Sequence, residues 1–139
     1  APGAVGLDYG SGPGPGPGMA ELFREKGFQM QCYDPFFQAD TAPLKRTFDF
    51  IVMSETAEHF ERPDAEWTQL AGLLKPGGIL GVMTSLVAPG VDWAKWSYAN
   101  DETHVCFYSQ QSMKWLAAKH GWRIEMESSP VIIFRSNSK

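Results

Sequence analysis

Residues 4–18 read AVGLDYGSGPGPGPG, a short apolar run that ends at an acid and opens into a turn with glycine at every second position. The apolar run, residues 4–8, predicts a short buried strand of a parallel sheet. Glycine reaches backbone angles that other residues avoid and lets the backbone pass close to a bound molecule. A strand, a glycine turn and a following helix together form the kind of loop that holds a nucleotide-like cofactor.

The segments that follow alternate between helix and strand patterns. Apolar residues at helical spacing predict a helix over residues 19–26, and alternation predicts a strand over residues 28–33. Helices are also expected from Asp64 and after Ser109, because an acid and a serine can cap a helix start. Further strands, of which the last two are joined by a short turn and must be antiparallel, are expected at residues 48–53, 79–84, 122–126 and 131–134.

These elements predict an α/β fold, with residues 1–139 forming a single domain. The sheet is expected to be Rossmann-like, twisted and mostly parallel, with one antiparallel strand near the C-terminus and helices on both faces. Residues 35–47 are too few for a full crossover with a long helix, so we expect a shortened middle region with a helical turn and a vestigial strand near Asp40. Residues 86–108 show no period and are rich in aromatic side chains, which suggests a lid or an interaction surface.

The composition, with 43% hydrophobic and 20% charged residues, describes an ordinary soluble globular protein. A net charge of −4 argues against a nucleic-acid partner, since phosphate contacts require a basic surface. No apolar run reaches the ~20 residues of a membrane helix and no signal-peptide pattern is visible, so we expect a cytoplasmic protein without a membrane partner. Cys32 and Cys106 are expected to be reduced thiols. The histidines and cysteines show no spacing typical of a ligand cluster, so no metal is expected, and the oligomeric state stays open.

The spacing of the glycines decides which cofactor the loop suits. The dinucleotide pattern Gly-x-Gly-x-x-Gly fails in every frame, because its third glycine position falls on Pro15, Pro17, Met19 or Glu21. No Gly-Lys-Ser/Thr follows the turn, which excludes a P-loop. Asp8 lies inside the motif, where its charge would repel a pyrophosphate and suit a ligand that carries an ammonium group.

The chain resembles the small-molecule branch of the class I S-adenosylmethionine-dependent methyltransferases over nearly all of its length. The glycine stretch carries the resemblance, together with Asp34 at the end of the second strand and the corner Lys75-Pro76-Gly77-Gly78. The resemblance implies S-adenosyl-L-methionine as the cofactor and implies that Asp34 accepts both ribose hydroxyls while Pro35 lies beside the adenine. It also assigns the methionine part of the cofactor to the first motif, which comprises Asp8, Tyr9, Gly10, Ser11 and Gly12.

Met53, Ser54 and Glu55 follow the strand at residues 48–53, and open α/β sheets bind ligands beyond the carboxyl ends of their strands. We therefore expect these three residues to contact the cofactor or the acceptor. His59 is a candidate general base, although in the resembled family the Glu-His pair often serves the turn structurally. His104 is a candidate for a role near the acceptor. Methyl transfer mainly requires alignment and a dry site, so a dedicated catalytic residue is not required.

Two functions of different classes follow. The first is an S-adenosylmethionine-dependent methyltransferase that acts on an unidentified small-molecule acceptor. The resembled family places cap helices before the first strand, and the sequence leads us to expect that they are absent here or lie elsewhere. The second is a methyltransferase-like, non-catalytic domain that uses residues 86–108 to bind a protein partner.

Overall fold

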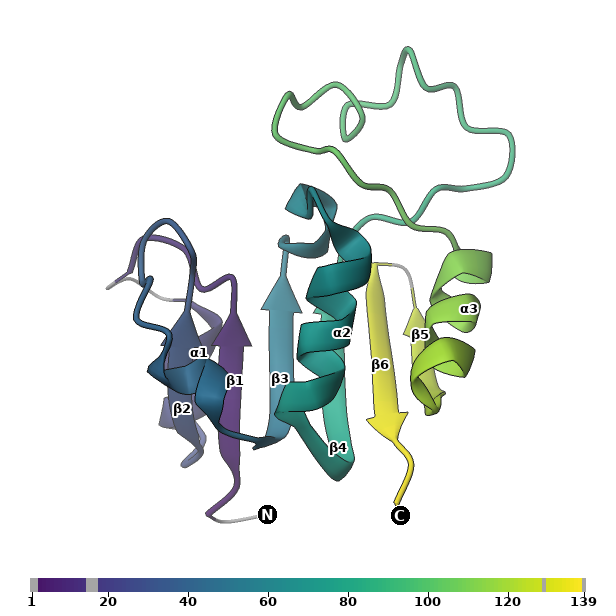
Figure 1. Cartoon of the computed structure of the whole chain (residues 1–139). Coiled ribbons are helices and arrows are strands. Elements are labelled where there is room, and N and C mark those ends of the chain that lie inside the picture. The colour runs from purple at the N-terminus through teal and green to yellow at the C-terminus, as the bar shows by residue number, and fades with distance from the viewer. Residues whose placement is uncertain (1–2, 15–17, 129, 139) are drawn as a thin grey trace.

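A six-stranded sheet forms the centre of the fold (Figure 1). The computed structural model describes residues 3–14, 18–128 and 130–138, so Pro15 and Pro17 of the glycine stretch lie outside the described residues. The strands lie side by side in the order β2-β1-β3-β4-β6-β5. Their bounds are β1 (Val5–Tyr9), β2 (Gln29–Tyr33), β3 (Phe48–Ser54), β4 (Leu74–Met83), β5 (Trp122–Ser128) and β6 (Val131–Ser136).

The pairing confirms the expected Rossmann-like sheet with one reversed strand. β1 pairs in parallel with both β2 and β3, and β3 pairs in parallel with β4. β6 lies between β4 and β5 and is antiparallel to both. The chain leaves β1 toward β2 and then returns to β3 on the other side, which makes the carboxyl ends of β1 and β3 the point where a parallel sheet binds ligands.

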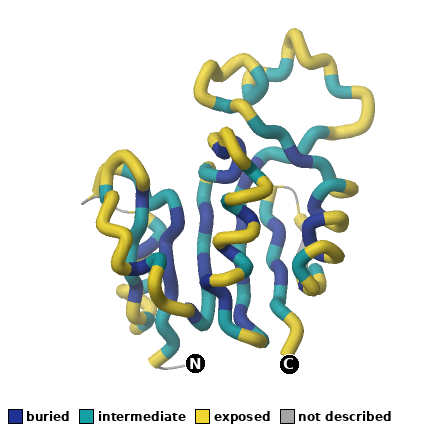
Figure 2. Tube along the Cα trace, viewed as in Figure 1, coloured by how far each residue is buried: buried dark blue, intermediate teal, exposed yellow. Residues whose placement is uncertain are grey.

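Three α-helices cover the two faces of the sheet, as expected. α1 (Met19–Glu25) lies behind the sheet in Figure 1, whereas α2 (Pro63–Leu73) and α3 (Gln110–His120) lie in front. The main core fills the front layer, where Trp67 of α2 is 1% exposed. Trp67 belongs to the same core cluster as five fully buried strand residues: Leu7, Ile51, Leu80, Ile132 and Phe134. Figure 2 shows the exposed residues on the outer sides of α2 and α3 and over the segment that joins β4 to α3.

The layer behind the sheet is thinner and depends on a glycine. Phe23 of α1 packs on Phe50 of β3 with ring centroids 5.1 Å apart. A Cβ added at Gly6 would lie 2.3 Å from the Phe50 ring and 2.6 Å from the sulfur of Met30. Gly6 therefore makes room for the aromatic contact that holds α1 on the sheet.

The structure corrects two expectations about helix starts and the middle region. α2 begins at Pro63, one residue before Asp64, because proline is preorganised for the first helical position. Asp64 caps nothing and instead pairs with Lys119 of α3. Residues 35–47 contain the expected helical turn, η1 (Ala42–Lys45). In the described part of the chain, the expected vestigial strand near Asp40 is reduced to an isolated bridge between Asp34 and Gln38. The Asp40 carboxylate accepts a hydrogen bond from the Ala42 N–H, which turns the backbone toward η1 instead.

Local chemistry predicted both ends of α3, whereas the start of β4 differs from the prediction. Ser109 caps α3 in a reciprocal capping box with Ser112, and Gly121 ends the helix with a left-handed φ of 68°. β4 begins at Leu74, earlier than the expected Ile79, with an irregular register opposite Phe48 and Phe50. None of the helices described by the structure is long and apolar enough to cross a membrane.

Residues 86–108, called the aromatic loop from here on, rise above the carboxyl ends of the strands (Figure 1). Leu86 and Tyr108 form an isolated bridge that joins the two ends of the loop. Trp93, Trp96 and Phe107 pack against one another with ring centroids 5.5–5.7 Å apart. The loop therefore packs on its own aromatic side chains and lies above the carboxyl ends of β3 and β4 (Figure 1).

Candidate functional site

Residues 10–14, called the glycine loop from here on, cross the ends of β1 and β2. The backbone conformation favours glycine at positions 10 and 12. Gly10 and Gly12 have φ values of 81° and 71°, a region that glycine adopts without strain. A Cβ added at Gly10 would lie 2.3 Å from Cγ2 of Thr56, whereas a Cβ added at Gly12 would meet open space. The Gly10 and Ser11 N–H groups both donate to the Tyr33 carbonyl, which fixes the loop over β2.

Asp34, which directly follows β2, lies beside this loop, and its carboxylate organises the backbone. Its Oδ2 accepts from the Gly12 N–H at 2.9 Å, and its Oδ1 accepts from the N–H groups of Phe36 and Phe37 at 2.9 and 3.1 Å. The residue is 7% exposed. A carboxylate offers about four lone-pair sites, so one remains for a ligand hydroxyl in this arrangement.

Asp8, the acid of the motif, faces away from the open side of the loop. It is 3% exposed, and its Oδ2 accepts from the Ala20 N–H at the start of α1. Burial raises the pKa of its carboxyl, and the bond from Ala20 acts in the opposite direction. In the structure, Asp8 therefore anchors the first turn of α1 behind the loop.

Tyr9 and Met53 point into the core. The Tyr9 hydroxyl bonds to Glu66 Oε2 and to Gln69 Oε1 of α2, and burial together with the Glu66 contact raises the pKa of the phenol. Met53 is 2% exposed and packs in the front layer. Both side chains are therefore part of the core. Pro35 is exposed and Ser54 is half-buried, both at the carboxyl edge of the sheet.

The turn after β3 is held in an unusual conformation. Glu55 has a φ of 51°, which is uncommon for a residue with a side chain and marks local strain. Its N–H donates to the Met83 carbonyl, and its Oε2 accepts from the Tyr98 hydroxyl at 3.0 Å. Partial desolvation raises the pKa of the Glu55 carboxyl, and the neighbouring Glu58 raises it further. Thr56 Oγ1 contacts the Gly10 carbonyl at 3.4 Å, so this turn adjoins the glycine loop.

Glu58, His59 and His104 form a cluster, which we call the acid–histidine cluster. Glu58 and His59 belong to the turn η2 (Ala57–His59), and His104 belongs to the aromatic loop. The two imidazole rings lie 4.9 Å apart between centroids. Glu58 is fully buried, and its Oε2 accepts from Thr84 Oγ1 at 3.0 Å.

The sequence identifies the two histidines as separate candidates and does not predict that they meet. It does not single out Glu58, Thr84 or Tyr98 as functional candidates. The available signal was an acid followed directly by a histidine after a buried strand. The sequence spacing did not show that His59 and His104 lie together, and the prediction that no metal binds stays untested.

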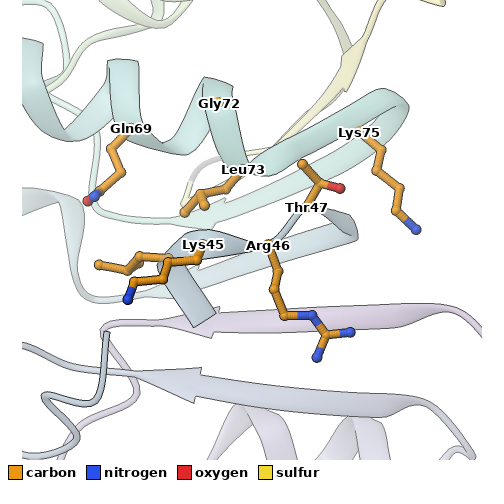
Figure 3. Close-up of a pocket in the computed structure, with 8 residues that line it drawn as sticks. Lys45, Arg46, Thr47, Gln69, Gly72, Leu73 and Lys75 are labelled. Carbon is orange, nitrogen blue, oxygen red and sulfur yellow. The ribbon is translucent and has the colours of Figure 1, made fainter. Parts of the chain in front are cut away.

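A broad hollow of about 710 Å³ lies at the opposite ends of the strands from the glycine loop (Figure 3). It is lined by residues before β3 and at the end of α2, including Lys45, Arg46, Gln69 and Leu73. The parallel strands have their amino ends on this side of the molecule, whereas ligands of such sheets bind at the carboxyl ends. The hollow is therefore not the expected cofactor site.

Sequence comparison matches residues 1–127 to a family described as a methyltransferase domain, and no curated protein matches the chain. Among solved structures, a Bacillus halodurans protein assigned as a methyltransferase aligns with a TM-score of 0.71 and 19% identity over 91% of this chain. Phosphoethanolamine N-methyltransferase 2 of Haemonchus contortus aligns with a TM-score of 0.69 and 18% identity over 90% of this chain. The 1,6-didemethyltoxoflavin N1-methyltransferase of Burkholderia thailandensis aligns with a TM-score of 0.67 and 17% identity over 98% of this chain.

At these identities the likeness shows the fold. The chain spans 62%, 34% and 72% of the length of these three proteins, in the same order.

Proposed function

The chain belongs to the methyltransferase-domain family, and on this premise we propose that it binds S-adenosyl-L-methionine at the glycine loop and transfers the methyl group to a small-molecule acceptor. The observation that carries the proposal is the contact between Asp34 and the glycine loop. The Gly12 N–H bond to Asp34 Oδ2 brings an acid with a spare lone pair next to Gly12, where an added Cβ would meet open space among the described residues. The Haemonchus and Burkholderia proteins bind S-adenosyl-L-methionine and S-adenosylhomocysteine, respectively, which supports this choice of ligand.

The residues present fit such a ligand in three places. The open space beside Gly12 leaves room for a group against the backbone at this position, which would hold the methionine part. The free acceptor site on Asp34 suits a ribose hydroxyl. Pro35 is exposed at the same edge and would lie beside the adenine.

Asp8 receives a different role from the one that the resemblance implies. Its carboxylate holds the start of α1 and would act on the ligand only through the position of the loop. Tyr9 and Met53 would contribute backbone alone, because their side chains lie in the core. Ser54 and Glu55, at the end of β3, would face the cofactor or the acceptor.

The bound cofactor would supply an electrophilic methyl group, and this chain would supply alignment and exclusion of water. The aromatic loop lies over the carboxyl edge and would cover the reacting groups (Figure 1). If the acceptor must lose a proton, His59 or His104 would take it at Nε2. In both histidines, Nδ1 contacts a backbone carbonyl, which leaves Nε2 as the basic atom.

Calorimetry with S-adenosylhomocysteine tests the proposal. We expect one molecule to bind per chain and Asp34→Asn to weaken binding roughly 10- to 100-fold, the usual effect of losing a hydrogen bond to a charged group. Glu61→Gln is the matched control, since it also removes one acid but from an exposed position. If folded wild-type protein fails to bind at millimolar ligand, the proposal is wrong.

The non-catalytic alternative gains some support from the aromatic loop, where Trp93 is 49% exposed. A folded protein that binds no S-adenosylhomocysteine but loses a protein partner on Trp93→Ala would favour this alternative. A cytoplasmic location and the lack of a nucleic-acid partner stay predictions from composition and charge.

A further inference from the structure

We propose that the acid–histidine cluster of Glu58, His59 and His104 is a binding site for one divalent transition-metal ion. One potential ligand atom from each of the three residues lies within 4.8 Å of the others. Metal–ligand bonds of about 2.0–2.2 Å place the ligand atoms of one ion roughly 3–3.5 Å apart, so the side chains would have to bring these atoms about 1–2 Å closer together to complete the site. His59 has a side chain that is 40% exposed and is free to make this adjustment.

Both histidines are held in the tautomer that leaves Nε2 free to bind a metal. His59 Nδ1 lies 2.8 Å from the Thr103 carbonyl oxygen, and His104 Nδ1 lies 2.6 Å from that of Tyr98. A carbonyl oxygen can only accept a hydrogen bond, so each Nδ1 carries the proton. In the neutral rings Nε2 therefore keeps its lone pair, the arrangement typical of metal-binding histidines whose other nitrogen donates to a carbonyl.

Glu58 provides a second, independent indication of a ligand. Its side chain is fully buried, and its Oε1 has no hydrogen-bond partner among the residues that the structure describes. This atom faces the histidines, since Oε1 lies 4.0 Å from His59 Nε2. A buried carboxylate oxygen without a partner is costly, and a cation bound to it would remove that cost.

The neighbouring groups also favour a cation. Glu55 lies next to Glu58, and Asp101 Oδ2 lies 3.7 Å from His104 Nε2, so two further acids flank the cluster. Two imidazole nitrogens and one carboxylate suit a transition metal such as Zn²⁺, Co²⁺ or Fe²⁺ better than Mg²⁺ or Ca²⁺, which prefer oxygen ligands alone. Three protein ligands would leave coordination positions open for water or another molecule.

The position of the cluster gives such an ion a use. The turn that carries Glu58 and His59 contacts the glycine loop through Thr56, and Thr84 fixes Glu58 from the end of β4. An ion there would bind an acceptor oxygen and lower its pKa, which would make it a better nucleophile. With Nε2 of both histidines bound to the ion, neither histidine would act as the base, so the ion would replace that proton transfer. This last role rests on the proposed function, whereas metal binding itself does not.

Titration of tag-free wild-type protein with Zn²⁺, followed by calorimetry, and with Co²⁺, followed by its visible absorption, tests the proposal. We expect one ion per chain. His59→Gln and His104→Gln should each weaken binding by more than the roughly 10- to 100-fold that loss of an outer-shell partner costs. His120→Gln removes the third histidine, on α3, and Cys106→Ser removes a thiol near the cluster, so both controls should keep wild-type affinity.

Unchanged Zn²⁺ affinity in both cluster variants would overturn the proposal, as would binding that disappears only in Cys106→Ser. Glu58→Gln is a weaker test, because the residue is buried and the variant can fail to fold. A titration of chelator-treated protein with S-adenosylhomocysteine separates the two proposals. Cofactor binding without metal binding contradicts only the metal site, and metal binding without cofactor binding contradicts only the proposed function.

Discussion

Replacing Gly10 by alanine should destabilise the protein far more than the same change at Gly12. Both positions have a positive φ, 81° and 71°, so each alanine carries the backbone strain of about 1–2 kcal/mol that the left-handed region imposes. Only at Gly10 would the new Cβ collide, at 2.3 Å from Cγ2 and 2.4 Å from Oγ1 of Thr56. Overpacking adds typically ~1–3 kcal/mol, so we expect a loss of about 2–5 kcal/mol for Gly10→Ala.

A double variant separates the effect of the collision from that of the backbone strain. In Gly10→Ala/Thr56→Ala the two closest atoms are gone and the nearest remaining one is Thr56 Cβ, at 2.9 Å. Relative to Thr56→Ala alone, adding Gly10→Ala should therefore cost less than it does in the wild type. Urea unfolding of the wild type, Gly10→Ala, Thr56→Ala and the double variant, together with Gly12→Ala, gives these differences in the free energy of unfolding directly. Equal losses for Gly10→Ala and Gly12→Ala, or no recovery in the double variant, would refute the reasoning.

Three further changes test the fold and its electrostatics. Leu80→Ala removes a fully buried side chain and should lower the free energy of unfolding by about 2–5 kcal/mol, measured with urea. Ser109→Ala breaks the capping box with Ser112 and should cost about 1 kcal/mol in the same assay. The Lys75 ammonium lowers the pKa of Asp49, so this carboxylate stabilises the fold above its unfolded pKa of about 3.9 and loses that effect as the pH falls through its folded value. The difference in urea midpoint between wild type and Asp49→Asn should therefore be present at pH 7 and shrink as the pH falls below the unfolded pKa. A difference that grows in acid would contradict the assignment.

The elements that the sequence predicted well are those defined by local chemistry. Ser109 and Gly121 mark the two ends of α3, because a serine cap and a left-handed glycine each end a helix through contacts within one turn. The reversed strand near the C-terminus followed from the short turn between two strand patterns. Asp64 failed as a cap because Pro63, its neighbour, sets the helix start more strongly.

The site was harder to predict, for two physical reasons. Side chains alternate along a strand, so Tyr9 follows Leu7 into the core while Asp8 turns to the other face; the motif alone does not report this parity. The meeting of His59 and His104 depends on the path of the aromatic loop, which has no periodic pattern to read. Distant contacts of this kind come from tertiary structure alone.

Backbone amide NMR shifts on titration with S-adenosylhomocysteine test the central claim most directly, because they report where the ligand binds. The account predicts that the largest changes occur at Gly10, Ser11 and Gly12 and at the Phe36 and Phe37 amides that Asp34 holds. Changes centred on the hollow at Lys45 and Arg46, or no changes at millimolar ligand, would contradict it.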